Sequence, residues 1–306
     1  IKGISFWRKK NFILSIFADN IFKIMKNTNT KNIFTRFNKI LLSIIFIISS
    51  SINIFAQYEP NKEFGVLVGT GYYIGDMNST HFNNLHVAGG LTYRVNFDRR
   101  FSFKSAALYT NIYADDANSS DPIKKNRNLH FKSEIIELSG QLEFNFLPYE
   151  TGNSLYSWSP FVFIGAAIYN HNPKAEALDG QWYDLQKLGT EGQGTTTFAN
   201  RKKYALTQLS MPFGGGVKIG VSENFNIILE YGLRKTSTDY LDDVSMTYAG
   251  IPTEFDNLTI ELSDRSLDGP QSAGIARGDE TNNDWYSFSG ITLSFRLQGN
   301  TKGCNY

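Results

Sequence analysis

The sequence predicts an all-β protein, an eight-stranded antiparallel up-and-down transmembrane β-barrel with long external loops. The first observation is residues 130–147, in which apolar and polar side chains alternate almost without interruption. Successive side chains of a strand point to opposite faces, so this segment is a strand between an apolar and a polar environment. Globular strands usually run to roughly 5–6 residues, whereas a tilted strand needs about 9–11 to cross a bilayer. The length therefore favours a membrane barrel.

The second observation is the order of strands and connections. Long connections alternate with short ones, so that in an up-and-down meander all long connections lie at one end and all short turns at the other. Bacterial outer-membrane barrels have short periplasmic turns, longer external loops and an even strand number. We therefore expect an outer-membrane location with both termini in the periplasm. The expected strands are 63–74, 84–97, 100–113, 131–147, 159–171, 204–222, 225–240 and 284–298.

The two faces of these strands have different expected environments. The apolar face should contact lipid, and the polar face should point into a lumen too narrow for a pore. The aromatic residues near strand ends, Phe161 and Tyr286 among them, are expected to form girdles at the membrane interfaces. The polar face carries mixed charges that permit ion pairs across the lumen: Arg94, Lys104, Glu137, Glu143, Lys218, Glu230, Arg234 and Arg296.

Alternation alone leaves a second fold open. A soluble eight-stranded barrel of the lipocalin type would place the apolar face inside and the charged face in water. The aromatic residues at the presumed strand ends suit membrane interfaces better than a ligand cavity. The long loops raise a separate choice, because they could either plug the barrel mouth or contact a surface partner.

The N-terminal region has the pattern of an export signal. A basic stretch from Met25, an apolar run from Ile40 to Ile48 and the Ala56–Gln57 junction predict a signal peptide over 25–56. Residues 1–24 are interpreted as upstream translation, and 57–306 as the barrel domain. A formal net charge of +1 and a pI near 7.9 give no electrostatic case for nucleic acid as a partner.

Several local patterns resemble metal-binding or catalytic sites. Asp239, Asp242 and Asp243 could bind a hard cation, but a hydrated loop base that pairs with Arg234 or Lys235 is the preferred interpretation. His81 or His86 could assemble a hydrolytic triad with Asp76 and Ser79 at the outer rim, but no nucleophile motif accompanies them. We expect no catalytic residues, no cofactor and no metal.

Five blocks of the sequence carry a further signal: Arg127 to Ser133, Asn172 to Ala175, Gly180 to Thr195, Leu206 to Gly216 and Glu230 to Ser245. Together they resemble the PorG family of Bacteroidetes outer-membrane proteins, also described as DUF6089 barrels. The resemblance implies a structural, non-enzymatic component of the type IX secretion system, tied to gliding in some members of the phylum. It also implies, as partners, outer-membrane lipid and a periplasmic ring of PorK lipoprotein and PorN.

If this role holds, the candidate ring contacts are the parts expected at the periplasmic end. They are residues 57–63, the 148–158 turn with Pro148 and Tyr149, and the 298–306 tail with Cys304, the single cysteine, which could link to a lipoprotein. The alternative functions are an outer-membrane lipid-modifying enzyme and a surface adhesin-type barrel.

Overall fold

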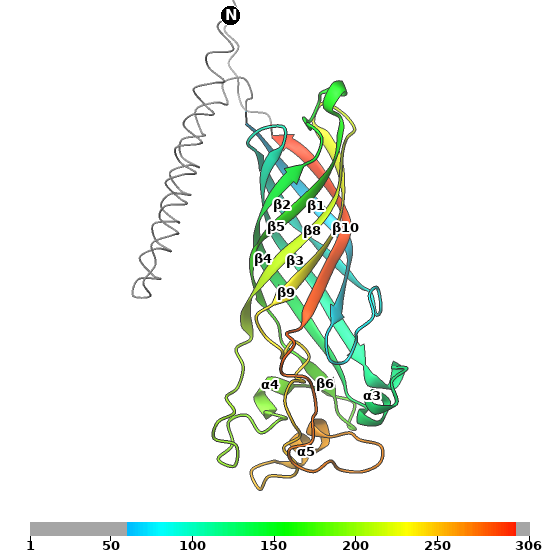
Figure 1. Ribbon diagram of the computed structural model, residues 1–306, viewed down its shortest axis with the longest axis vertical. Coiled ribbons are helices and arrows are strands. Elements are labelled where there is room, and N and C mark those ends of the chain that lie inside the picture. Colours follow the sequence, from blue (N-terminus) through cyan, green and yellow to red (C-terminus); the bar gives the residue numbers. More distant parts are fainter. Residues whose placement is uncertain (1–59, 298–306) are drawn as a thin grey trace, which may run out of the picture. The chain divides into compact units, whose positions relative to one another are not determined.

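A computed structural model describes residues 60–297, and these form one closed barrel with loops at both ends (Figure 1). Neighbouring barrel strands are antiparallel and pair in chain order, and pairing between the first and last closes the ring. The predicted eight-stranded antiparallel barrel is therefore confirmed. Its strands are β1 (Asn61–Ile74), β2 (His86–Asn96), β3 (Phe101–Asp115), β4 (His130–Asn145), β5 (Trp158–Asn170), β8 (Thr207–Gly220), β9 (Phe225–Thr236) and β10 (Trp285–Leu297).

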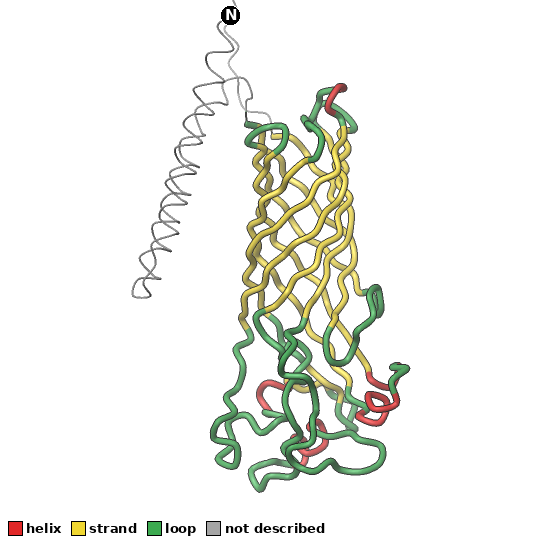
Figure 2. The backbone as a smooth tube through the Cα atoms, viewed as in Figure 1, coloured by secondary structure: helices red, strands yellow, loops and turns green. Residues whose placement is uncertain are grey.

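The connections differ at the two ends, as predicted (Figure 2). The short-turn end carries connections 97–100, 146–157 and 221–224. The opposite, long-loop end carries 75–85, 116–129, 171–206 and 237–284, which we call the cap. The cap contains elements that periodicity did not predict: η2 (Asp116–Asn118), α3 (Pro122–Arg127), β6 (Lys174–Glu176), β7 (Trp182–Asp184), α4 (Leu185–Leu188) and α5 (Asn257–Ser263). None of the helices within residues 60–297 is long and apolar enough to span a membrane.

The barrel exterior is apolar and its interior largely polar. In β4, Ile136, Leu138 and Leu142 are 58–60% exposed, whereas Glu137 and Glu143 are 1% exposed. The same alternation recurs on the other strands, so an apolar surface surrounds the barrel. Such a surface would be costly in water and is stable in hydrocarbon, since closing the sheet satisfies the backbone groups. This arrangement is the opposite of a soluble barrel with an apolar cavity.

Two aromatic residues expected in the interfacial girdles lie inside the barrel instead. Phe161 is 2% exposed and Tyr286 is fully buried. Space for the ring of Phe161 and that of the neighbouring Phe163 comes from small residues: a Cβ on Gly216 would lie 2.9 Å from Phe161, and one on Gly232 would lie 2.5 Å from Phe163. The glycines therefore serve close packing.

An apolar core joins the barrel interior to the cap. Tyr73, Phe131 and Phe288 come from barrel strands, and Leu241 and Leu262 come from the last connection; all belong to one buried cluster. The long connections are thus packed onto the barrel mouth rather than extended away from it. This packing explains why 237–240, predicted to continue β9, leave the sheet: Thr238 and Asp239 are buried in the cap.

The outward face of β4 gives a direct test of the barrel's environment. Leu138→Arg places a charge on that face at mid-strand, and in lipid vesicles we expect it to lower the free energy of unfolding by about 2–4 kcal/mol. Leu178, in the cap, is 84% exposed, and Leu178→Arg is the matched control with a change within about 0.5 kcal/mol. Equal, small effects of both substitutions would mean that the apolar face of β4 does not contact hydrocarbon.

Candidate functional site

The barrel lumen holds a compact cluster of charged side chains centred on Glu143. Arg94 binds Glu143 through two hydrogen bonds, of 2.8 Å from Nε and 3.1 Å from Nη2. Lys218 Nζ lies 2.6 Å from Oε2 of the same carboxylate, and Lys104 Nζ lies 3.8 Å from Oε1. All four side chains are at most 1% exposed. A single carboxylate therefore lies between three buried cations.

Two further carboxylates balance this excess of positive charge. Glu230 accepts hydrogen bonds of 2.9 and 2.8 Å from Lys104 Nζ. Glu63 accepts one of 3.1 Å from Arg94 Nη1 and one of 2.7 Å from the Asn96 amide. Buried ions need such pairing because their desolvation costs several kcal/mol each.

A second ion pair lies nearer the cap. Arg234 Nε donates to Glu137 Oε2 over 3.1 Å, and the Tyr286 hydroxyl donates to the same oxygen over 2.9 Å. The Arg234 guanidinium also lies 4.8 Å from the centre of the Phe288 ring. With this pair included, the lumen contains four carboxylates and four cations, Glu63, Glu137, Glu143 and Glu230 with Arg94, Lys104, Lys218 and Arg234, and its formal charge is zero.

Two charged residues, Arg296 and Glu63, lie at other positions than the sequence predicted. Arg296 was assigned to the lumen network, but it is only partly buried, and its Nη1 donates to the Thr151 carbonyl over 3.2 Å at the short-turn end. Glu63 was assigned to a periplasmic segment, but it is 1% exposed and belongs to the network. The alternation could have revealed this, because Glu63 follows the phase opposite to outward-facing Phe64, Val66 and Val68.

The network and its aromatic neighbours fill the lumen. Phe163 lies 5.0 Å from Lys104 Nζ and Phe161 lies 4.9 Å from Lys218 Nζ, measured to the ring centres. Lys104 of β3 and Glu230 of β9 meet across the barrel, and both are at most 5% exposed. Because these side chains are almost inaccessible to solvent, this layer closes the lumen, and the geometry is that of a sealed cylinder and not of an open aqueous channel.

At the short-turn end, the 146–157 connection is a rigid projection. Arg99 Nε donates to Glu150 Oε2 over 2.8 Å, and the Arg99 guanidinium lies 4.4 Å from the centre of the Tyr156 ring. At its tip, in η3 (Ser154–Tyr156), Leu155 is 83% exposed. Leu155 is therefore fully accessible at the tip of this connection.

The expected contact residues of this connection lie at different depths. Pro148 is partly buried, while Tyr149 is 2% exposed, with its ring centre 5.8 Å from Lys218 Nζ. Tyr149 closes the end of the lumen and is not available on the surface, which corrects its assignment as a partner contact. Cys304 lies outside the described residues.

At the long-loop end, a buried ion pair joins the two longest connections. Glu191 Oε1 accepts from Arg277 Nη1 over 3.1 Å and from the Ser245 amide over 3.0 Å. Arg277 also donates to the Asp243 carbonyl over 2.5 Å and to the Ser263 carbonyl over 3.1 Å. The Glu191–Arg277 bond links residues that are 86 positions apart, so it ties the two connections to each other within the cap.

The three aspartates Asp239, Asp242 and Asp243 are buried, not hydrated as the sequence suggested. The Tyr73 hydroxyl lies 2.5 Å from Asp242 Oδ2 and 3.0 Å from Asp284 Oδ1. One hydroxyl has one proton to donate, so a protonated carboxyl must supply the second contact. Burial raises the pKa of Asp242 and that of Asp284 well above the usual range, which agrees with such a shared proton.

Asp243 and Asp239 complete this group. Asp243 accepts hydrogen bonds from Thr190 and Tyr204, and burial raises its pKa to about 6. Burial also raises the pKa of Asp239 to about 7, with Asp76, Glu191 and Asp279 adding repulsion. The described residues show no ion pair between these aspartates and Arg234 or Lys235; the expected pairing is wrong, because the chain turns away from β9 into the cap.

The hypothetical triad does not assemble. His81 Nδ1 lies 2.9 Å from the Tyr72 hydroxyl, and His86 packs against Tyr113 at 6.1 Å between ring centres. Within residues 60–297 no hydrogen bond joins either histidine to Asp76 or Ser79, and no group of three or more metal-ligating side chains is positioned to hold an ion.

Comparisons with known proteins give one family and several distant barrels. A family model described as Domain of unknown function (DUF6089) matches residues 38–261. No curated protein matches the chain.

Three solved structures illustrate the distant likenesses. Ail, the attachment invasion locus protein of Yersinia pestis, is 10% identical over 78% of this chain and 100% of its own, with a TM-score of 0.39. Neisserial surface protein A is 7% identical over 78% and 97%, with a TM-score of 0.37. Outer membrane protein OprG of Pseudomonas aeruginosa is 9% identical over 77% and 94%, with a TM-score of 0.32.

The central position of Glu143 predicts a large effect of its neutralisation. Glu143→Gln leaves Arg94, Lys104 and Lys218 with too little negative charge, and we expect the free energy of unfolding to fall by about 3–5 kcal/mol. Glu134 is exposed on the same strand, so Glu134→Gln should change it by no more than about 0.5 kcal/mol. Urea titration in lipid vesicles measures both, and a Glu143 variant as stable as the control would contradict a structural role for the network.

The pKa of Asp239 predicts a pH dependence of the cap. Because this pKa is raised above that of the unfolded chain, near 3.8, its stabilising contribution is complete below pH 4 and is lost as the pH rises towards 7. We expect amide hydrogen exchange in 238–250, corrected for its intrinsic pH dependence, to show weaker protection at pH 8 than at pH 5. The loss of protection between pH 5 and pH 8 should be smaller in Asp239→Asn than in the wild type. In the exposed control, Asp268→Asn, the loss should equal that of the wild type. A decline that is the same in all three proteins would rule out Asp239 as its source.

Proposed function

Since the chain belongs to the DUF6089 family, we propose that it is a PorG-like, structural and non-enzymatic outer-membrane barrel of the type IX protein secretion machinery. In this role it anchors a periplasmic ring of PorK-like lipoprotein and PorN-like subunits to the outer membrane, and it contributes to gliding where that motility occurs. The ring and its secretion role come from the PorG resemblance. The location follows from the apolar exterior of a closed barrel.

The sealed lumen supports an anchor over a conduit. A secretion pore needs an open water-filled path, whereas here the buried network of Glu143, Arg94 and Lys218 occupies the barrel interior. An anchor needs a stable membrane cylinder, which the closed barrel supplies, and a contact surface on one side, for which exposed Leu155 is our candidate. The sealed lumen is the observation that carries the proposal.

The loop asymmetry supports an orientation with the short-turn end in the periplasm. In that orientation β1 begins and β10 ends on the periplasmic side, where Leu155 and the remaining candidate contact Pro148 also lie. Cys304 stays a candidate contact from the sequence. Leu155 is then the most exposed apolar side chain of that end, and the Arg99–Glu150 pair holds its connection in place. A ring subunit with an apolar pocket would gain buried area from this contact.

The ring contact can be tested with a matched pair of substitutions at opposite ends of the barrel. Leu155→Asp introduces a charge at the proposed contact, and we expect at least about a tenfold loss of ring subunits that co-purify with the barrel from detergent extracts. Leu178 is equally exposed, at 84%, but lies in the cap, so Leu178→Asp should retain the ring. The barrel yield from the membrane reports that both variants fold.

Three outcomes would count against the proposal. Loss of the ring in Leu178→Asp with retention in Leu155→Asp would place the contact at the other end. Retention of the ring in both would remove Leu155 from the interface. Purification of the wild-type barrel without any ring subunit would argue for the alternatives, a lipid-modifying enzyme or an adhesin-type barrel.

A further inference from the structure

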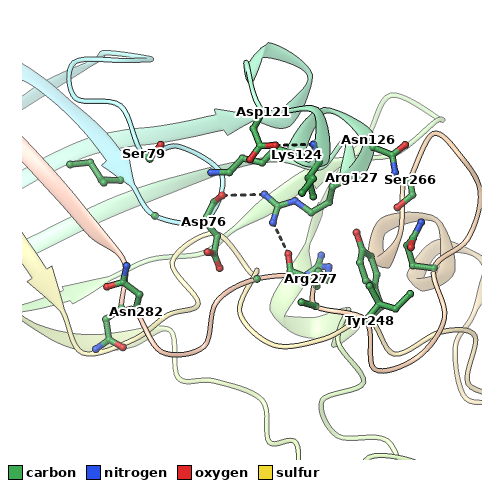
Figure 3. A pocket seen from close by; sticks show the side chains of 18 of the residues that line it. Asp76, Ser79, Asp121, Lys124, Asn126, Arg127, Tyr248, Ser266, Arg277 and Asn282 are labelled. Carbon is green, nitrogen blue, oxygen red and sulfur yellow. Dashed lines mark hydrogen bonds between the residues drawn. The ribbon is translucent and has the colours of Figure 1, made fainter.

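A cavity of about 440 Å³ opens in the cap beside the ends of β1 and β10 (Figure 3). Ile74 and Trp285 line it from the two strands, Lys124 from α3, and Gln271 and Asn282 from the last connection. Its volume falls within the roughly 300–1,000 Å³ of small-molecule sites. The cavity is separate from the sealed lumen and from the short-turn end, and the proposed anchoring function does not use it.

The walls of this cavity are held in place by Arg127. Its Nε donates to Asp116 over 2.6 Å, its Nη1 to the Arg277 carbonyl over 2.6 Å, and its Nη2 to the Asp76 carbonyl over 3.3 Å. Figure 3 shows Arg127 between Asp76 and Arg277, so one guanidinium joins three different connections. A site whose walls are already fixed loses little conformational entropy when a ligand binds.

The polar groups around the cavity retain hydrogen-bonding capacity. Asp76 accepts from the Asp279 amide through Oδ2, which leaves Oδ1 available. In the part of the chain that the structure describes, neither the Lys124 ammonium nor the Asn282 side-chain amide makes a hydrogen bond. These groups present both acceptors and donors at the same opening.

Two further amides offer acceptors. Gln271 uses its Nε2 to donate to Asp268 over 3.0 Å, and Asn283 uses its Nδ2 to donate to the Thr236 carbonyl over 3.1 Å. Both side-chain carbonyl oxygens therefore remain for a ligand. The lining combines several amides with a carboxylate and an ammonium, and this mixture can bind neutral groups that donate and accept at once.

We propose that this cavity binds a neutral saccharide. Each sugar hydroxyl both donates and accepts hydrogen bonds, which matches the amide and carboxylate groups, and the C–H faces of the ring can pack on Ile74, Ile275 and Trp285. An anionic ligand is disfavoured because Asp76 and Asp121 line the cavity, and because the two arginines of the lining already have carboxylate partners. Arg127 pairs with Asp116 and Arg277 pairs with Glu191, which leaves Lys124 as the unpaired cation among the described lining residues. A purely apolar ligand is disfavoured because it would leave the polar lining unpaired.

The position of the cavity restricts the source of the saccharide. It lies at the long-loop end, which the proposed orientation exposes at the cell surface. The saccharide is therefore either the sugar part of a membrane glycolipid or a soluble glycan, and both have the same recognition chemistry. Binding itself does not depend on the secretion role, so the two proposals can fail separately.

The test uses the full barrel in detergent micelles and saturation-transfer NMR. The probes are neutral mono- and disaccharides of glucose, galactose, mannose and N-acetylglucosamine, with inorganic phosphate as an anionic comparison. Ala276 is exposed and lines the cavity, so Ala276→Trp should fill it and abolish binding. Ser272 is exposed on the same loop outside the lining, so Ser272→Trp is the matched control and should bind as the wild type does. Asn282→Ala should weaken binding by up to about tenfold through one lost hydrogen bond.

The results separate the possibilities. The proposal is supported by saturable binding of at least one saccharide that is lost in Ala276→Trp and kept in Ser272→Trp. Competition by vesicles containing lipopolysaccharide would then identify a glycolipid as the source. Absence of that competition would identify a soluble glycan. Absence of saccharide binding at millimolar concentration, binding that Ala276→Trp leaves unchanged, or preferential binding of phosphate would overturn it. Ring co-purification is measured on the same Ala276→Trp protein, and its retention shows that the barrel and the anchoring role are intact.

Discussion

The closed hydrogen-bonded ring of eight strands is the constraint on which the rest of the structure depends. In hydrocarbon every backbone donor and acceptor needs a partner, and pairing of β1 with β10 supplies the last of them. Eight strands enclose only enough room for side chains. The inward residues therefore have to pack and hydrogen-bond with one another, and the outward residues have to be apolar.

The narrow lumen explains why its charges are balanced. Arg94 and Lys104 face each other across the β2–β3 pair, an arrangement of like charges that is unfavourable by itself. Glu143 lies between them on β4 and binds both, and Glu63 and Glu230 supply the remaining negative charge. Such a cluster adds little net stability, because the cost of desolvating the charges offsets much of the attraction between them. Removing any one of its side chains is nevertheless costly, because it leaves a buried charge unpaired.

The two ends of the barrel are built differently. At the short-turn end, Tyr149 and the Glu63 cluster close the lumen beneath a short rigid projection. At the other end, the cap continues the barrel core outwards and contains hydrogen-bonded buried carboxylates, Glu191 and Asp242 among them. The lumen is therefore closed by side chains, and the two ends differ in how they are packed.

The strands and the environment of each of their faces could be predicted from the amino-acid pattern, because the alternation of side chains along a strand is a local property. Residues of β4 from Glu134 to Asn145 could be assigned to the exterior or interior one by one, Glu143 among them. Where both faces of a strand are apolar, as around Phe161 in β5, the alternation does not show which side chains point inwards. For this reason the predicted position of Phe161 was wrong. Tyr286 shares the phase of inward Thr292 and Ser294, so a signal for its position was present.

The pairing of the charges, the positions of the cap residues and the place of the cavity depend on how the whole chain folds. Glu143 meets Lys218 because β4 and β8 both border β5 in a closed ring, and Glu191 meets Arg277 because two long connections fold against each other. These contacts join residues far apart in the chain, and the alternation of apolar and polar residues does not predict them. Local alternation specifies a face, whereas a partner on that face is specified only when the ring closes and the loops pack.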